Sequence, residues 1–172
     1  MLAGRVVKLL GDAGIAARTD ATRGFDHGTF VPLKVSWPNV EVPTIRLSLK
    51  AGLDPDEHLA IGRALQPLRD EGVLILGSGM SYHNLRILRT RSAPQTAPAF
   101  DAWLTTAATA ATEMRSVLLR AWDSAPGARD AHPREEYLLP LMVVAGAAGH
   151  DRGSISFSED WMGAPISAFR FG

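Results

Sequence analysis

Residues 43–77 read PTIRLSLKAGLDPDEHLAIGRALQPLRDEGVLILG, and this stretch decides the predicted fold. Its first part, residues 43–49, alternates aliphatic and polar side chains, which is typical of a strand. Its last part, residues 73–77, is a continuous aliphatic run bounded by glycine, as in a buried central strand. A strand, a helix and a second strand in this order predict a right-handed crossover that joins two parallel strands.

The helix between the two predicted strands has a strong start signal. Asp54 is a capping residue, Pro55 suits the first helical position, and Glu57 has the spacing of a capping box. We expect this helix to run to about Glu71 and to end at Gly72. The predicted fold class is therefore α/β, with a central mixed or parallel sheet flanked by helices in a three-layer arrangement.

The segments on either side of this unit are also predicted from their patterns. Residues 30–38 fit a short helix or a strand about equally. The other predictions are a helix over residues 1–14, a helical region over 98–124 broken near 111–113, a helix from about 133 that Pro140 kinks or starts, and a terminal hairpin or edge strands over 153–172. We expect residues 1–172 to form a single domain.

Composition excludes several classes of function. The 172 residues carry 18 basic and 18 acidic side chains, so no excess of charge favours nucleic acid or an anionic membrane as a partner. The sequence contains no cysteine, which excludes disulfide scaffolds, thiol catalysis and cysteine-ligated metals. No apolar run reaches the length of a membrane span, and the start has no signal-peptide pattern. We therefore expect a cytoplasmic protein.

His83 is the strongest candidate for chemistry. It follows the predicted strand 73–77 in the loop GSGMSYHN, and ligands of open α/β sheets bind beyond the carboxyl ends of strands. Histidine titrates near neutral pH, so it can move a proton or bind a metal. The same position also fits an ordinary surface-loop histidine.

The other histidines carry weaker signals. His27 lies in the sequence Asp-His-Gly, which more often marks a turn than a site. His132 has the spacing to share a helix face with Glu135 or Glu136 and bind a cation, although acidic residues also favour a helix start for electrostatic reasons alone. His58 is expected to be exposed in its helix, and His150 to lie in a solvated loop.

Several longer blocks resemble the class III extradiol ring-cleavage dioxygenases, and most closely their DOPA 4,5-dioxygenase-like branch. The blocks are GFDHGTFVPL, DEHLAIGRALQPLRDEGVLILGSGMSYHNLR, AHPREEYLLPLMVVAGAAG and MGAPISAFRFG, and they follow in order along the chain. The resemblance implies cleavage of a catechol-type aromatic ring by O₂ at non-haem Fe(II), or at Zn(II) in some members. It also implies that residues 1–172 correspond to the C-terminal two thirds of the family's subunit-B-type domain.

The resemblance assigns roles to individual residues. His83 matches a histidine described as an acid/base and sometimes as a metal ligand, and His27 matches a second acid/base. Ser81 and Asn84 are predicted to bind the substrate. Glu136 is a weak candidate for a metal ligand.

The sequence also departs from the family pattern. The family carries metal-ligand histidines in a His-Gly-Ser-Pro loop and a Ser-Ala-His-Trp segment, and neither motif occurs here. Tyr137 stands where the family usually has a further site histidine, and a phenol is a poor ligand for Fe(II). Relative to the family the sheet is therefore expected to be incomplete, and the metal site can be unoccupied.

Two hypotheses follow from these departures. In the first, the chain is a dioxygenase whose N-terminal part was lost or left out by a wrong start codon, so upstream sequence in frame should contain the two motifs. In the second, the chain is an inactive truncated homologue that binds a ligand or a partner. Uncovered sheet edges favour pairing, so a homo-oligomer is expected.

Overall fold

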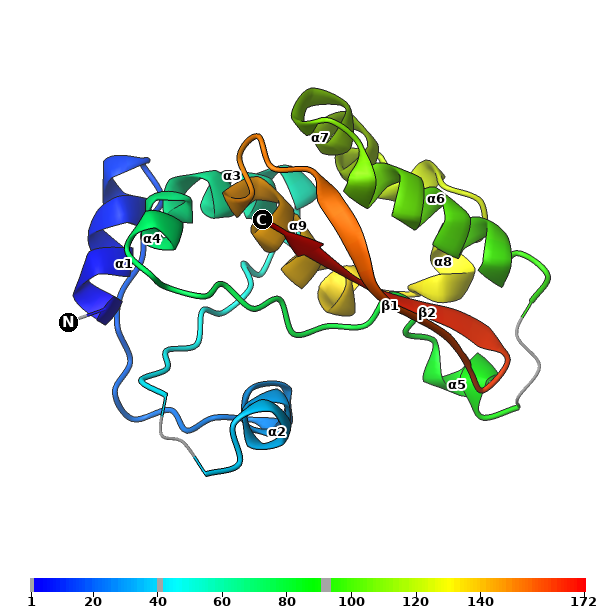
Figure 1. The fold of residues 1–172 in the computed structure, drawn as a ribbon, viewed down its shortest axis with the longest axis horizontal. Coiled ribbons are helices and arrows are strands. Elements are labelled where there is room, and N and C mark those ends of the chain that lie inside the picture. The colour runs from blue at the N-terminus through cyan, green and yellow to red at the C-terminus, as the bar shows by residue number, and fades with distance from the viewer. Residues whose placement is uncertain (1, 40–41, 91–93) are drawn as a thin grey trace.

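A computed structural model describes residues 2–39, 42–90 and 94–172, and shows a set of helices with one C-terminal hairpin (Figure 1). The elements are α1 (Leu2–Asp12), α2 (His27–Ser36), α3 (Pro55–Leu65), α4 (Pro67–Asp70), α5 (Leu85–Leu88), α6 (Ala97–Thr109), α7 (Thr112–Arg120), η1 (Trp122–Ser124), α8 (Ala128–Ala131), η2 (Glu135–Tyr137), α9 (Leu139–Ala147), β1 (Gly153–Trp161) and β2 (Ala164–Phe171). In the described part of the chain, no helix is long and apolar enough to cross a membrane.

Helices α3 and α9 pack backbone against backbone. A Cβ atom added at Gly62 would lie 2.1 Å from the carbonyl oxygen of Val143, and one added at Gly146 would lie 2.3 Å from that of Leu59. Distances this short leave no room for any side chain larger than hydrogen. The two glycines therefore set how closely the helices approach.

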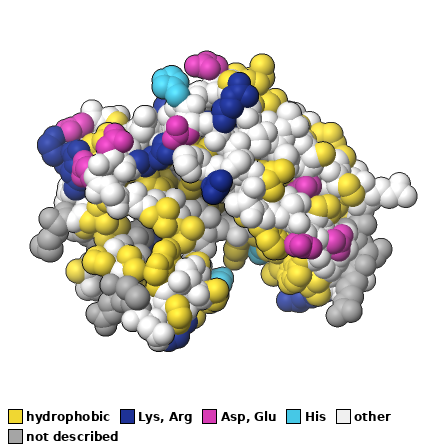
Figure 2. Space-filling model, in the orientation of Figure 1, with side chains coloured by type: hydrophobic (Ala, Val, Ile, Leu, Met, Phe, Trp, Pro, Cys, Tyr) yellow, Lys and Arg dark blue, Asp and Glu magenta, His cyan; other side chains and the backbone are white. Residues whose placement is uncertain are grey.

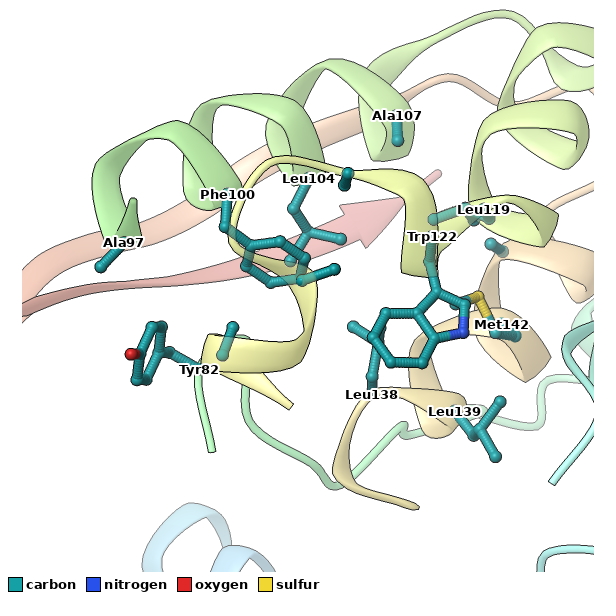
Figure 3. Packing of buried hydrophobic residues seen from close by; sticks show 14 of the residues in the cluster. Tyr82, Ala97, Phe100, Leu104, Ala107, Leu119, Trp122, Leu138, Leu139 and Met142 are labelled. Atoms are coloured by element: carbon teal, nitrogen blue, oxygen red, sulfur yellow. The ribbon is translucent and has the colours of Figure 1, made fainter. Parts of the chain in front are cut away.

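The main core lies between α6, η1 and α9. Phe100 and Leu104 of α6 are almost fully buried, and Trp122 lies near Leu139 and Met142 (Figure 3). A second, smaller core joins α1 to α3 and α4 and contains Val6, Leu10, Ile61, Leu65 and Leu68. The predicted N-terminal helix is thus confirmed, and its apolar face is the face that packs.

The predicted C-terminal hairpin is confirmed. β1 and β2 pair antiparallel, from Gly153 opposite Phe171 to Trp161 opposite Ala164. The register shifts between Ile155 and Phe157, as in a β-bulge. In the described residues this pair is the whole sheet.

The predicted parallel strands are not formed. Residues 43–49 and 73–77 are not in strands, and neither pairs with a described segment. Alternation predicts which side chains share a face, but a strand also needs a neighbour for its main-chain hydrogen bonds. The α/β character remains in part, as helices with a small antiparallel sheet, whereas the three-layer sheet is not confirmed.

The helix start at Asp54 is confirmed and the helix end is corrected. The Asp54 side chain accepts a hydrogen bond of 2.7 Å from the amide of Asp56, and Pro55 occupies the first turn. The helix is interrupted at Gln66, because the next residue, Pro67, has no amide hydrogen to continue the ladder. The predicted single helix is therefore α3 followed by α4. The break predicted near residues 111–113 separates α6 from α7, and Pro140 lies in the first turn of α9.

His58 was expected to be exposed, and this prediction is wrong. The side chain is fully buried, with Nε2 3.2 Å from the amide nitrogen of Lys50 and Nδ1 2.6 Å from the carbonyl oxygen of Asp54. The amide must donate to Nε2, so Nδ1 carries the proton and donates to the carbonyl. His58 thereby ties the preceding loop to the start of α3.

His132 is also fully buried, against the edges of two aromatic rings. Its ring centroid lies 5.6 Å from that of Phe100 and 6.0 Å from that of Trp122, and Nε2 is 2.9 Å from the carbonyl oxygen of Ser81. Burial lowers the pKa of His132 to about 4. The neutral His132 ring therefore carries its proton on Nε2 and donates it to the Ser81 carbonyl. His132 follows α8 and Glu135 begins η2, so the shared helix face considered for a cation does not exist.

We predict that Gly62→Ala lowers the free energy of unfolding by about 2–3 kcal/mol, since the new methyl group meets backbone that cannot turn away. Urea unfolding of both proteins measures the difference. Gly4→Ala in α1 is the matched control, because nothing lies within 4 Å of its added Cβ. Gly4→Ala should leave the free energy of unfolding unchanged or raise it by up to about 1 kcal/mol. Equal effects of the two substitutions would contradict backbone contact at Gly62.

We further predict that acid destabilises the protein through His132. Between the pKa near 6.5 of an unfolded histidine and the folded value of about 4, the unfolded chain binds the proton more readily. The free energy of unfolding therefore falls as pH is lowered through this window, by about 1.4 kcal/mol per pH unit. Urea unfolding at several pH values should give a smaller slope for His132→Gln than for the unaltered chain. His150→Gln, which alters an exposed histidine, should keep the original slope.

Candidate functional site

The candidate site is built on the loop that leaves residues 73–77. A Cβ atom added at Gly79 would lie 2.2 Å from the carbonyl oxygen of Tyr137, and one added at Gly77 would lie 2.8 Å from the Val144 side chain. The amide of Met80 donates a 3.0 Å hydrogen bond to the Tyr137 carbonyl. The two glycines thus let the loop lie directly on η2 and the first turns of α9.

This close approach places His83 against Tyr137. The two rings stack with centroids 3.5 Å apart and planes 14° from parallel. The His83 amide donates to the carbonyl of Ala131 over 3.0 Å, which fixes the backbone at this point. Burial lowers the pKa of the His83 side chain, and the nearby Glu136 carboxylate opposes part of that shift. His83 is therefore biased toward the neutral form, which can accept a proton.

Glu136 supplies the negative charge of the site. Its Oε2 atom is buried and lies 2.8 Å from Nε of Arg134, although the two groups are not aligned for a hydrogen bond. Arg134 therefore neutralises part of this charge, but no hydrogen bond from the described residues holds the buried oxygen. The resemblance placed Tyr137 at a site position, but no local pattern predicted its stacking on His83.

The polar groups of Ser81 and Asn84 already hold the loop in place. Ser81 accepts a hydrogen bond of 2.9 Å from the Ser167 amide, and its carbonyl accepts from His132. Asn84 caps α5 by accepting from the Ile87 amide, and it donates to the carbonyl of Asp130 over 2.8 Å. Both residues are buried. Their binding of substrate stays a prediction.

His27 is the first residue of α2 and is exposed. Its neighbour Asp26 forms an ion pair with Arg46. A Cβ atom added at Gly28 would lie 3.8 Å from Oγ of Ser78, so the start of α2 approaches the loop that carries His83. Figure 2 shows histidine side chains on the two sides of the hollow between α2 and the body of the molecule.

The family implies a metal, and the described residues do not complete a site for one. Within residues 2–39, 42–90 and 94–172, no group of three or more His, Asp or Glu side chains is placed to hold an ion. His83 and Glu136 provide two candidate ligands. Non-haem iron sites of the facial-triad type use two histidines and a carboxylate. The ligand set therefore does not fit a closed metal site by itself.

Two arginines that the sequence did not single out hold the C-terminal end of α9 and the residues that follow it. Arg115 is buried and donates to the carbonyls of Gly149 and Asp151 over 2.8 and 2.7 Å. Arg69 donates to the Ala148 carbonyl at the end of α9 over 2.9 Å, and to the Phe171 carbonyl at the end of β2 over 3.1 Å. The partners are main-chain oxygens distant in sequence, so no local signal marks either arginine.

Known proteins resemble this chain over nearly its whole length. A 4,5-DOPA dioxygenase extradiol of Beta vulgaris is 38% identical over 96% of this chain and 62% of its own length. The protein of the same name from Portulaca grandiflora is 40% identical over 93% of this chain and 60% of its own. The chain thus spans about three fifths of the length of these relatives.

A solved structure agrees with the sequence relatives. The crystal structure of an uncharacterized protein from Escherichia coli K12 matches with a TM-score of 0.85 at 29% identity, over 99% of this chain and 72% of the other. The family model described as the catalytic LigB subunit of aromatic ring-opening dioxygenase matches residues 1–169. The predicted resemblance is confirmed, and the chain belongs to the LigB family of ring-opening dioxygenases.

Proposed function

We propose that this chain carries the acid–base part of an extradiol dioxygenase that opens a catechol-type aromatic ring with O₂. Membership of the LigB family supports a dioxygenase of this type, and several relatives are named 4,5-DOPA dioxygenase extradiol. The observation that carries the proposal is the half-buried His83, stacked on Tyr137 and close to Glu136. A DOPA-like catechol is the substrate class we propose.

His83 is the proposed base. Its lowered pKa keeps the ring neutral at neutral pH, so it can accept a proton from a phenolic hydroxyl of the catechol. The imidazolium that results is stabilised by the Glu136 carboxylate, which favours the charged ring. The flat face of Tyr137 restricts the orientation of the imidazole, so the accepting nitrogen keeps a fixed direction.

His27, the first residue of α2, is the proposed second acid/base. The approach of Gly28 to Ser78 supports this role, because it places the start of α2 next to the His83 loop. An exposed histidine can exchange protons with water and return one to an oxygen of the opening ring. Ser81 and Asn84 act here by holding the loop, and substrate contacts from them remain part of the proposal.

LigB-family dioxygenases generally depend on a non-haem metal, and we propose Fe(II) or Zn(II), with Glu136 as a candidate ligand. A ligand role for His83 is the alternative to its role as the base, because a nitrogen that binds a metal cannot also accept the proton. The described residues do not complete the ligand set for such a metal. The alternative of an inactive ligand- or partner-binding module is not favoured, because the matched family and the named relatives are dioxygenases. A homo-oligomer and a cytoplasmic location stay predictions.

We predict that, at a pH slightly below the pKa of free 4-nitrocatechol, the chain binds this catechol as its coloured anion without added metal, because neutral His83 takes up the phenolic proton. His83→Gln should abolish the spectral shift, and His150→Gln should leave it unchanged. Oxygen uptake with DOPA and ferrous iron is the second readout, where loss of a general base costs about 10²–10⁴-fold in rate. The lowered pKa places the acidic limb of the pH profile below pH 6.5.

Two outcomes would contradict this role for His83. One is an unaltered spectral shift and an unaltered acidic limb in His83→Gln. The other is an equal loss in His150→Gln, which would indicate a general effect of removing a histidine. Circular dichroism of both variants checks that the fold is retained.

A further inference from the structure

A long groove runs along α9 and reaches the candidate site. One wall is the extended segment 74–77, the other is the β2 segment 167–172, and the floor includes Pro140, Leu141 and Val144. This part has a volume of about 440 Å³, and a continuation of about 330 Å³ extends past Val144 to Arg69 and Asp151. In Figure 1 the green segment that leaves α4 and the red strand β2 both run past α9. We call this feature the α9 groove.

The β2 wall presents main-chain groups that point away from β1. Alternate residues of an antiparallel strand direct both their N–H and C=O to the same side. The Ser167 amide donates to Ser81 and the Phe171 carbonyl accepts from Arg69, so residues 167, 169 and 171 face outward. Phe169, between them, has no outward hydrogen-bond partner in the described part of the chain. Its N–H and C=O are therefore free.

The opposite wall, residues 74–79, also presents main-chain groups that have no partner in the described part of the chain. The amides of Val73 and Met80 donate to Leu68 and Tyr137, but those of residues 74–79 find no partner among the residues that the structure describes. Leu74 and Leu76 are 68% and 54% exposed, whereas Val73 and Ile75 pack toward α1 and α3. A segment with free main-chain groups and one bare aliphatic face can pair with an added strand, as an unpaired sheet edge does.

We propose that the α9 groove binds one extended segment of a partner polypeptide, with aliphatic side chains at alternate positions, as a strand between residues 74–79 and β2. Both walls offer main-chain donors and acceptors, and the floor is apolar, which together are the requirements of strand addition. The partner's alternate side chains pack on Leu141 and Val144 of the floor. The same walls do not suit a helix, whose own main-chain groups are already paired.

The relatives contain candidate segments for a binding test. The chain covers 62% of the Beta vulgaris relative and 72% of the solved Escherichia coli chain, so each of these proteins has polypeptide outside the matched region. The groove ends at Ser81 and Tyr137, next to His83, so a bound segment reaches the candidate site. Only this last consequence rests on the proposed function.

The test is a titration with short fluorescent peptides that overlap along the part of the Escherichia coli relative outside the match. We compare Phe169→Pro with Phe169→Ala, because both lose the ring and only the first loses the outward N–H. Proline is tolerated on the open side of an edge strand. At least one peptide should bind Phe169→Ala, and should bind Phe169→Pro about tenfold more weakly, as expected for one lost hydrogen bond.

Hydrogen exchange supplies a second measurement on the unaltered chain. The amides of residues 74–79 should exchange fast alone and more slowly with the bound peptide. The proposal is overturned if no peptide binds, or if both Phe169 variants bind equally. It is also overturned if light scattering shows a dimer that Phe169→Pro abolishes and Phe169→Ala keeps, which would assign the groove to a second copy. The titration contains no catechol, metal or O₂, so its failure is distinct from failure of the proposed activity.

Discussion

The backbone contact between α3 and α9 is the constraint on which the rest of the structure depends. Gly62 and Gly146 let the helices touch, and Gly77 and Gly79 let the site loop touch α9 and η2. Helix α9 is therefore held at backbone distance by segments that lie far before it in the sequence. A change that moved α9 outward would also move Tyr137 away from His83. The same backbone contacts therefore determine both the stability of the helix pair and the geometry of the site.

Local signals predicted the elements that local chemistry determines. Asp54 and Pro55 mark the start of α3, and alternation in the last residues predicts the hairpin. The parallel strands failed for a different reason. Leu74 and Leu76 are exposed, and Val73 and Ile75 are only partly buried, so the aliphatic run is not a strand buried on both faces. A sequence pattern does not show whether another strand lies alongside. In the described residues no strand pairs with these segments.

Only part of the candidate site was predictable from the sequence. The position of His83 after an aliphatic run pointed to it, and the family resemblance added His27, Glu136 and Tyr137. Burial of a single histidine depends on segments far away, so His58 was assigned to the surface although it is fully buried. His83 stacks on Tyr137 only because Gly79 allows the loop to pass close to η2. Tertiary contacts of this kind leave no periodicity to detect.

A chain of hydrogen bonds joins the buried core to both the site and the α9 groove. Neutral His132 donates to the Ser81 carbonyl, and the Ser81 hydroxyl accepts from the Ser167 amide of β2. Protonation of His132 would place a second donor, Nδ1–H, where the buried atom has no acceptor. Relief of that cost requires movement of α8 or of the Ser81 loop, and Ser81 is two residues from His83. Acid would therefore disturb the site and the β2 wall of the groove together, because one serine anchors both.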